Sequence, residues 1–537
     1  MPARRTPRLP ALIACLALAT LAGCGGGDSG DAFDPSSCFY QYTLTDSPQL
    51  VGLDPLLTRQ WHLQNIGQSG GTPGEDLRAI AAWAETRGAG VRVAVVDDAI
   101  ETLHHDLSPN VVEGAWFDYR SNTATAPLPC YQDDDHGTAV AGIVLARDDN
   151  AAGGAGVAPR ASLAAYNALA TSTDADIADA LNRDLAGNAI YNNSWGSPDN
   201  GMLNPAEASF AAAIREGIDK GRNGKGAIYV FPAGNGGCFL VDRNGDCAFD
   251  ENSNYDGYVN KLGVITACAF DHDGKAPIYA EPGANVLVCG PSGNTDTAIT
   301  TTDVLDDYRS DFSGTSASTP MVSGTAALIL SANPSLTWRD VRLVLARSAR
   351  QNDPLHPGWV AGTAGRPPFN PYYGFGAADA QAAVALAKTW PSVGGSESLV
   401  KCGPYARGIG VLPFPIPIPD DASAAREDRI TVGSDCAIGK IEFVEIGFSA
   451  THPFSGDLRV ELFSPNGLVS RLADARLCDP DQDGFADNCG VYDDWRFGSV
   501  RHLDEPAPGT WRMVVSDLLA QDAGTWTGWS LTFWGRP

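Results

Sequence analysis

Between residues 54 and 390, short runs of β-branched residues alternate with longer stretches of small and apolar residues. Residues 91–96 and 262–266 are two such runs. Val and Ile favour strands, whereas alanine-rich stretches favour helices. Strands that alternate with helices along a chain form a mostly parallel sheet with helices on both faces. We therefore expect an α/β domain over residues 54–390.

The C-terminal part of the chain has a different pattern. Residues 441–448, 457–462 and 511–515 alternate apolar and polar side chains, and turn residues separate these runs. A period of two is typical of half-buried strands. We predict an all-β sandwich over residues 399–537 and a linker at 391–398. A chain of 537 residues is long enough for two packed domains.

The first residues carry the features of an export signal. Three arginines precede an apolar run at 11–22, which is too short to cross a bilayer comfortably. The run ends in Leu21-Ala22-Gly23-Cys24, which resembles a bacterial lipobox, although small residues before a cysteine can also occur by chance. In such signals the cysteine is lipidated and becomes the new N-terminus. We expect a lipoprotein signal peptide at 1–24, a tether and short segment at 25–53, and an exported protein anchored to a bacterial membrane or cell surface, from which it could be released.

Charge and cysteine content narrow the function further. The formal net charge of -27 argues against nucleic-acid binding. Ten cysteines follow Cys24, and an even number in an exported chain suggests disulfides rather than zinc, because no CxxC pair is present. The sequence leaves the connectivity open, and the plausible pairs are Cys238/Cys247, Cys268/Cys289, Cys402/Cys436, Cys478/Cys489 and, by remainder, Cys38/Cys130.

A candidate nucleophile lies in the segment 313–320, Ser-Gly-Thr-Ser-Ala-Ser-Thr-Pro. The small and apolar run that follows it predicts a tight turn leading into a buried helix. This turn would expose the Ser316 hydroxyl at a helix N-terminus, where the helix dipole favours developing negative charge. A helix cap formed by serine or threonine is the alternative interpretation.

Two further residues complete a catalytic pattern with Ser316. His136 begins a stretch of small residues, and Asp97 ends the apolar run 91–96. Either residue alone could be structural. However, serine needs a base to become a good nucleophile, and the base needs a carboxylate that orients it. The chain order Asp, His, Ser is the order found in subtilisin.

These motifs resemble those of the subtilases, and most closely their kexin/furin-like branch. Segments of the C-terminal part, including 452–458 and 528–531, resemble the kexin-type P domain. The resemblance implies a subtilisin-like catalytic domain at 54–390, a P domain at 399–537, and a serine endopeptidase acting on peptides or proteins. It implies that Asn235 is the oxyanion-hole donor, although a turn asparagine is the alternative.

The resemblance also implies how substrate binds. Ser194, Trp195 and Gly196 match the strand that pairs with the substrate backbone, although Trp195 could be ordinary core. The remaining substrate-binding candidates are acidic: Asp199 and Asp256 at the bottom of the main specificity pocket, and Asp98 and Asp133 facing the preceding substrate residue. We therefore expect kexin-like cleavage after one or two basic residues. The alternatives are a broad-specificity degradative subtilisin or an inactive surface-binding protein.

Calcium is the expected cofactor, because the candidate ligands are hard oxygen donors. Acidic turns without an ion are the alternative. The resemblance implies one site at Asp54, Asp106 and Asn150, and another at Asp199, Glu251 and Glu281. A third candidate is independent of the resemblance. Residues 479–487 place oxygens at alternate positions, as in the first part of an EF-hand loop, with Asp479, Asp481, Asp483 and Asp487 as candidate ligands.

Two features depart from the kexin-like pattern. The segment between Cys24 and Asp54 is too short for a folded inhibitory pro-domain, and it carries no dibasic cleavage site. We therefore expect either folding without an intramolecular chaperone or a separate protein that assists folding or inhibits the enzyme.

Overall fold

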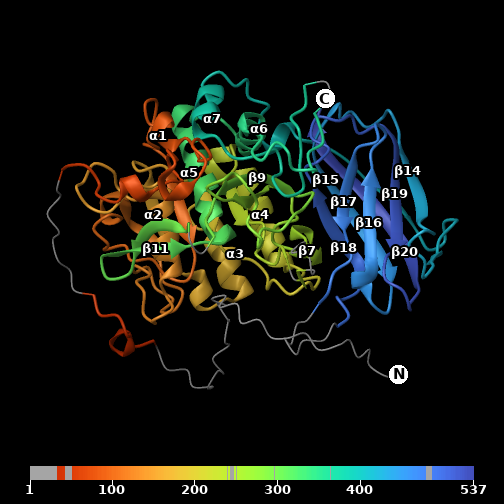
Figure 1. Cartoon of the computed structure of the whole chain (residues 1–537), viewed down its shortest axis with the longest axis horizontal. Helices are drawn as coiled ribbons and strands as arrows, with labels where there is room; N and C mark the ends of the chain where they lie inside the picture. The colour runs from red at the N-terminus through yellow and green to blue at the C-terminus, as the bar shows by residue number, and fades with distance from the viewer. Residues whose placement is uncertain are drawn as a thin grey trace.

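The structure is a computed structural model of the whole chain. It describes residues 33–42, 51–238, 240–241, 247–249, 251–294, 297–362, 365–478 and 487–537. Among the described residues, those up to Ala387 form a mixed helix and strand domain, and those from Val400 onward form a domain built mainly of strands beside it (Figure 1). None of the described helices is long and apolar enough to cross a membrane.

A seven-stranded parallel sheet lies at the centre of the first domain. Its strands, in spatial order, are β2 (Val111–Phe117), β3 (Ser162–Tyr166), β1 (Arg92–Val96), β4 (Ile190–Asn193), β5 (Ile228–Pro232), β8 (Val264–Phe270) and β9 (Val286–Pro291). The strands β4, β5, β8 and β9 are buried throughout, which explains their continuous apolar runs. The predicted α/β fold is confirmed.

Helices cover this sheet and place two of the predicted catalytic side chains. The helices are α1 (Ala79–Ala82), α2 (His136–Leu145), α3 (Asp174–Asn182), α4 (Ala208–Lys220), α5 (Thr315–Ala332), α6 (Trp338–Ser348) and α7 (Ala380–Ala387). Helix α5 packs against α2 and against β4, β5, β8 and β9. The small residues of α2 and α5 allow this close packing, for example at Gly324, where an added Cβ would lie 2.5 Å from a carbon of Val157.

The remaining elements of this domain are short. Two hairpins are formed by β6 (Leu240–Val241) with β7 (Cys247–Phe249) and by β10 (Ile299–Asp303) with β11 (Asp307–Phe312). Short 3-10 helices lie at Pro35–Ser37, Leu57–Arg59, Gln68–Gly70, Ser108–Asn110, Ala168–Ala170, Gly221–Gly224 and Ser253–Tyr255.

The C-terminal domain is the predicted all-β sandwich. One sheet contains β12 (Val400–Gly408), β13 (Ile416–Ile418), β15 (Lys440–Thr451), β18 (Tyr492–Ser499) and β20 (Gly524–Arg536). The other contains β14 (Arg426–Val432), β16 (Leu458–Phe463), β17 (Val469–Ala473) and β19 (Gly509–Asp517), and two 3-10 helices lie at Ser396–Ser398 and Ser455–Asp457. Alternate residues are buried along β14, β16 and β19, as their period of two predicts.

Buried charges join the two domains. The fully buried Arg339 of α6 forms a two-bond ion pair with Glu442 of β15, with nitrogen–oxygen distances of 2.6 and 2.8 Å. Arg339 also donates to backbone carbonyls of residues 393–395, so the linker is held against α6. A second ion pair crosses the interface between Arg347 and Asp504. Breaking the buried pair between Arg339 and Glu442 would cost about 3–5 kcal/mol.

Four of the plausible cysteine pairs are disulfides in the structure. They are Cys38–Cys130, Cys268–Cys289, Cys402–Cys436 and Cys478–Cys489. The side chain of Cys247 lies outside the described residues, so the fifth pair stays a prediction.

Candidate active site

Asp97 and His136 are joined by a hydrogen bond at the carboxyl end of β1. Asp97 follows the last residue of that strand and its side chain is fully buried, whereas His136 is the first residue of α2. His136 Nδ1 lies 2.8 Å from Asp97 Oδ1. Burial disfavours the imidazolium, but the Asp97 carboxylate outweighs burial and raises the pKa of His136 above its ordinary value. The carboxylate therefore fixes the ring and favours its protonated form.

Asp98 holds the start of α2. Its Oδ2 accepts from the backbone N–H of His136 at 3.1 Å, and its Oδ1 accepts from the N–H of Gly137 at 2.7 Å. These are two of the free donors of the first helical turn. Burial, followed by the charge of Asp97, raises the pKa of Asp98 to about 8. Asp98, which the sequence analysis assigns to substrate binding, therefore also positions the helix that begins with His136.

Ser316 is the second residue of α5 and faces the end of β4. Its hydroxyl donates to the carbonyl of Ser194 at 3.2 Å. Ser316 thus lies in the first turn of α5, at the helix N-terminus, as the sequence predicts. The hydroxyl proton is used in this bond, and catalytic hydrogen bonds often form only when substrate is bound.

Asn235 lies in the loop after β5 with an exposed side chain. Its Oδ1 accepts from both the backbone N–H and the hydroxyl of Thr315, at 2.8 and 2.9 Å. Because the oxygen is engaged, the NH₂ group is the part of the amide that remains available as a donor beside Ser316. This is the orientation that an oxyanion-hole donor needs.

A cleft with about 460 Å³ of empty space, partly open to solvent, lies beside Ser316. Its lining includes most of the predicted substrate-binding residues: Ser194, Trp195, Gly196, Asp199 and Asp256, together with Asn235, Glu251 and Glu281. Trp195 donates from its indole to the carbonyl of Val96 at 2.9 Å, so it also anchors this wall to β1. Burial raises the pKa of Asp256 to about 6, against the hydrogen bonds it accepts from Ser197.

Three carboxylates lie near one another in the lining of this cleft. Asp199 and Glu281 share a hydrogen bond, and burial raises the pKa of Glu281 well above its usual range, followed by the charges of Glu251 and Asp199. Two ionised carboxylates cannot lie this close without a proton or a cation between them. Glu251 Oε2 is buried and has no hydrogen-bond partner within the described part of the chain. Carboxylate oxygens are ligands of the type that calcium prefers.

The same carboxylates hold the loop that carries Asn235. Glu281 Oε1 accepts from the N–H of Gly236 at 3.0 Å, and Asp199 accepts from the backbone N–H of Asn235. A side chain at Gly234 would be strained, because φ is +113° and an added Cβ would lie 2.1 Å from Glu281 Oε1, which would have to move. The predicted metal site and the predicted oxyanion donor are therefore one connected structure.

The structure also brings together Asp54, Asp106 and Asn150. Asp54 accepts from the N–H groups of Asp149 and Asn150, each at 3.0 Å, and Asn150 Nδ2 donates to Asp106 Oδ1 at 2.6 Å. Asp106 also accepts from the hydroxyl of Tyr308 at 3.1 Å. Burial raises the pKa of Asp106 to about 7. Buried oxygen donors from three separate segments fit a second calcium ion.

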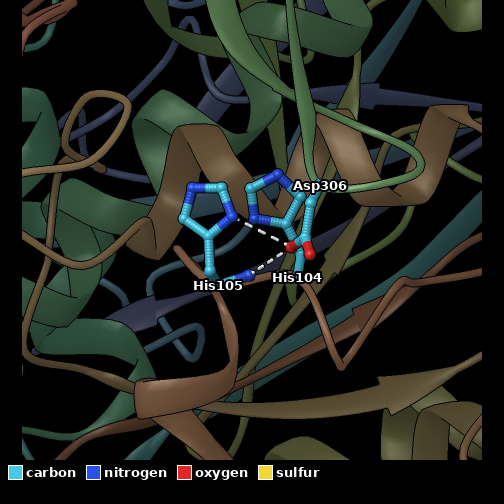
Figure 2. Close-up of side chains that lie close together, drawn as sticks. All are labelled: His104, His105 and Asp306. Atoms are coloured by element: carbon cyan, nitrogen blue, oxygen red, sulfur yellow. Dashed lines mark hydrogen bonds and ion pairs between the residues drawn. The ribbon is translucent and has the colours of Figure 1, made fainter. Parts of the chain in front are cut away.

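Beside this site, His104, His105 and Asp306 lie close enough to suggest a transition-metal centre (Figure 2). However, the backbone N–H of Asp106 donates to His104 Nδ1 at 3.0 Å, and His104 Nε2 is bonded to the carbonyl of Asp307 at 3.0 Å. Both ring nitrogens of His104 are thus used. The group ties the 303–307 turn to the loop that carries Asp106.

Among the described residues, Asp133 and Asp487 are predicted site residues that do not line the cleft. Asp133 is exposed in the turn before α2. Asp479, Asp481 and Asp483 lie outside the described residues. Asp487 is exposed, and its N–H donates to the carbonyl of Cys478 at 2.7 Å.

Comparison with known families agrees with this geometry. The subtilase family model matches residues 88–376, which is more than half of the chain. This chain belongs to the subtilase family. The model for the proprotein convertase P-domain matches residues 441–533 of this subtilase, within the sandwich.

The subtilase is similar to several convertases. It is 34% identical over 90% of its length to the dibasic-processing endoprotease of Schizosaccharomyces pombe, and 33% identical over 90% to kexin of Saccharomyces cerevisiae. It spans 65% and 56% of those two proteins, which is less than two thirds of each. It is also 34% identical to human neuroendocrine convertase 2, covering 90% of its own length and 74% of the convertase.

Solved structures of the serine protease of Aeromonas sobria have the same fold. The protease alone superposes with a TM-score of 0.79 at 28% identity, covering 95% of this subtilase and 99% of the other chain. The protease in complex with its chaperone gives a TM-score of 0.80 at 28% identity, covering 91% and 96%.

Sequence reasoning did not identify three residues that support the site of this subtilase. Thr315 orients Asn235, Phe312 packs 5.2 Å from the His136 ring centroid, and Arg476 reaches Gly201 from the sandwich. Of these three residues, Thr315 alone could have been proposed from the sequence, because it directly precedes Ser316.

Proposed function

We propose that this subtilase is a calcium-dependent, kexin-like serine endopeptidase that cleaves peptide bonds after basic residues and prefers basic pairs. The carrying observation is the set of carboxylates that line the cleft beside Ser316. A lysine or arginine side chain would compensate these partly buried charges, whereas a neutral side chain would leave them unpaired.

The catalytic step follows from the positions of three side chains. Ser316 Oγ attacks the scissile carbonyl carbon, and His136 Nε2 accepts the hydroxyl proton, since Nδ1 is occupied by Asp97. Asp97 keeps the ring in this tautomer and stabilises the imidazolium. His136 then gives the proton to the leaving amine, and water repeats the sequence on the acyl-enzyme.

The negative oxygen of the tetrahedral intermediate would be bound by the Asn235 amide and by a backbone N–H near Ser316. Each such donor stabilises the transition state by about 3 kcal/mol. The hydrogen bonds from Thr315 to Asn235 support this role, because they orient the amide before substrate arrives.

The substrate backbone would pair with the segment 194–196 as an added strand. Gly196 supports this arrangement, because an added Cβ would lie 2.6 Å from Asp256 Oδ2 and would cover the carboxylate. Asp199 and Asp256 would then meet the first basic residue, and Asp98 and Asp133 the preceding one.

Two calcium ions would be held by the oxygen donors described above. Asp199, Glu251 and Glu281 would hold one ion, and Asp54, Asp106 and Asn150 would hold the other. Calcium supplies the positive charge that these buried carboxylates lack.

Cleavage of matched peptides tests the proposal. Peptides ending in Lys-Arg, Ala-Arg and Ala-Phe before the scissile bond should be cut in that order of kcat/KM, with Ala-Phe slower by about a hundredfold or more. The names of the dibasic-processing relatives support this order. Equal cleavage of Ala-Phe would instead identify a broad-specificity degradative subtilisin.

Export and anchoring form a separate part of the proposal. The lipobox-like residues before Cys24 support lipidation of that cysteine, and the chaperone-bound Aeromonas protease supports a separate folding helper. Replacement of Cys24 by serine should move the protein from the membrane fraction to the soluble fraction. An unmodified, wholly soluble wild-type protein would contradict anchoring.

A further inference from the structure

The wall of the specificity cleft touches the C-terminal sandwich. Residues 199–204, which we call the wall segment, run from Asp199 to Asn204, and both of these line the cleft. The N–H of Leu203 donates to the carbonyl of Cys489 at 3.2 Å. An added Cβ on Gly201, which has φ +74°, would lie 2.3 Å from the carbonyl oxygen of Leu477. The wall segment is therefore held between the cleft and the sandwich backbone.

Arg476 makes the central contact of this interface. It is 2% exposed, and its Nε donates to the carbonyl of Gly201 at 2.5 Å. The N–H of the same Gly201 donates to Glu251 Oε1 at 2.9 Å. Gly201 thus links the guanidinium of the sandwich, through its carbonyl, to a carboxylate that lines the cleft, through its N–H.

A second route reaches the other side of the cleft. The Arg476 guanidinium lies 3.8 Å above the ring of Tyr255, and the Tyr255 hydroxyl is bonded to the backbone of Asp474 in the same sandwich loop. Tyr255 directly precedes Asp256, and its carbonyl accepts from the N–H of Asn204 at 2.9 Å. Movement of Arg476 would therefore disturb both Glu251 and Asp256.

The burial of this guanidinium has a cost that domain docking alone does not require. Arg476 Nη2 is buried and has no hydrogen-bond partner among the residues that the structure describes. The planar guanidinium is held by fixed contacts, because Nε donates to the carbonyl of Gly201 and Nη1 donates to the hydroxyl of Tyr492 at 3.1 Å. This fixed geometry suits a residue that positions the wall segment.

We infer that Arg476 is a positioning residue for substrate specificity: from the sandwich, it fixes the wall segment and the acidic cleft at the spacing that receives a basic side chain. The inference rests on the proposed cleavage after basic residues. It assigns to the sandwich a part in substrate selection in addition to its packing against the catalytic domain.

Three variants of the full chain test the inference. Arg476→Met keeps the apolar stem but loses the donor and the charge, whereas Arg476→Lys keeps the charge. Arg347→Ala is the matched control, because it removes an interdomain ion pair away from the cleft. KM, kcat and Tm are measured for each with the Lys-Arg and Ala-Arg peptides.

We expect KM for both peptides to rise about tenfold in Arg476→Met and less in Arg476→Lys, with kcat changed by less than about threefold. Arg347→Ala should lower Tm and leave KM at the wild-type value. Unchanged KM in the Lys and Met variants, or an equal rise in Arg347→Ala, would overturn the inference.

If Arg476→Met does not fold, the Lys variant decides the question. KM must rise in it while Tm stays close to that of the wild type. The proposed function fails separately, when the wild-type enzyme does not prefer basic peptides. In that case the KM of each variant for the best-cut peptide still reports whether Arg476 positions the cleft.

Discussion

The side-chain oxygen of Asn235 lies 2.8 Å from the backbone nitrogen of Thr315, the residue that precedes the candidate nucleophile. This bond fixes the direction of the amide before any substrate is bound. In the proposed mechanism, the amide that would face the developing oxyanion is therefore oriented by the turn that also presents Ser316.

Replacement of Asn235 by alanine should lower kcat by about 10²–10³ with little change in KM, because the amide acts mainly on the transition state. Steady-state kinetics with a basic peptide measure both constants. Thr315→Val is a useful companion, since it removes one of the two bonds to Asn235 and should lower kcat less. A rise in KM with an unchanged kcat would show that Asn235 binds ground-state substrate instead.

Replacement of Ser316 by alanine should lower kcat by several orders of magnitude, because the attacking oxygen is removed. The melting temperature should stay close to that of the wild type, since the Ser316 side chain makes a single hydrogen bond to the residues that the structure describes. Ser318→Ala is the control, as its hydroxyl is buried in the same helix turn. Near-normal hydrolysis by the Ser316 variant would place the nucleophile elsewhere.

The dependence of kcat/KM on pH should report the pKa of His136 in its pair with Asp97. Only neutral His136 can act as a base, so kcat/KM should fall as pH is lowered through its pKa. Since Asp97 raises that pKa, the acid limb should lie above pH 6.5, the ordinary value for histidine.

In Asp97→Asn, burial should dominate, and the limb should move to lower pH while the maximal rate drops by about 10⁴. The same profile recorded for both enzymes checks the direction. A limb at the same pH in both would assign the titration to another group.

Chelation of calcium should lower both Tm and kcat. The carboxylates of Asp199 and Glu281 hold the N–H groups of Asn235 and Gly236, so loss of the ion would release the oxyanion loop as well as destabilise the fold. Differential scanning calorimetry and peptide kinetics, with chelator and after re-addition of calcium, measure the two effects.

Asp106→Asn, in the other predicted calcium site, should lower Tm with a smaller effect on kcat, because that site does not contact the oxyanion loop in the structure. Identical melting curves with and without chelator would contradict structural calcium.

The sheets and the candidate catalytic residues could be predicted, because each has a local pattern in the sequence. The period of two in β16 and β19 and the continuous apolar run of β8 reflect burial on one face or on two, so both sheets were predictable. Asp97, His136 and Ser316 could be proposed because each lies directly after a strand or in the first turn of a helix, and the bond between Asp97 and His136 agrees with that prediction.

The parts that escaped prediction depend on contacts between distant segments. Asp98 was interpreted only as facing substrate, because the sequence does not show that its two oxygens accept the N–H groups of His136 and Gly137. Arg476 lies 275 residues from Gly201 along the chain, and no periodicity marks a guanidinium that crosses between domains. Such contacts require the packed structure.

The buried ion pair between Arg339 and Glu442 has an evolutionary consequence. A descendant that lost the sandwich would keep the buried Arg339 guanidinium of α6 without its counter-charge. A descendant that acquired a different sandwich would need a glutamate at the position that Glu442 holds in β15. Loss or exchange of the C-terminal domain therefore requires a simultaneous change in α6. We expect the two halves of this lineage to have been inherited together, as a single unit of selection.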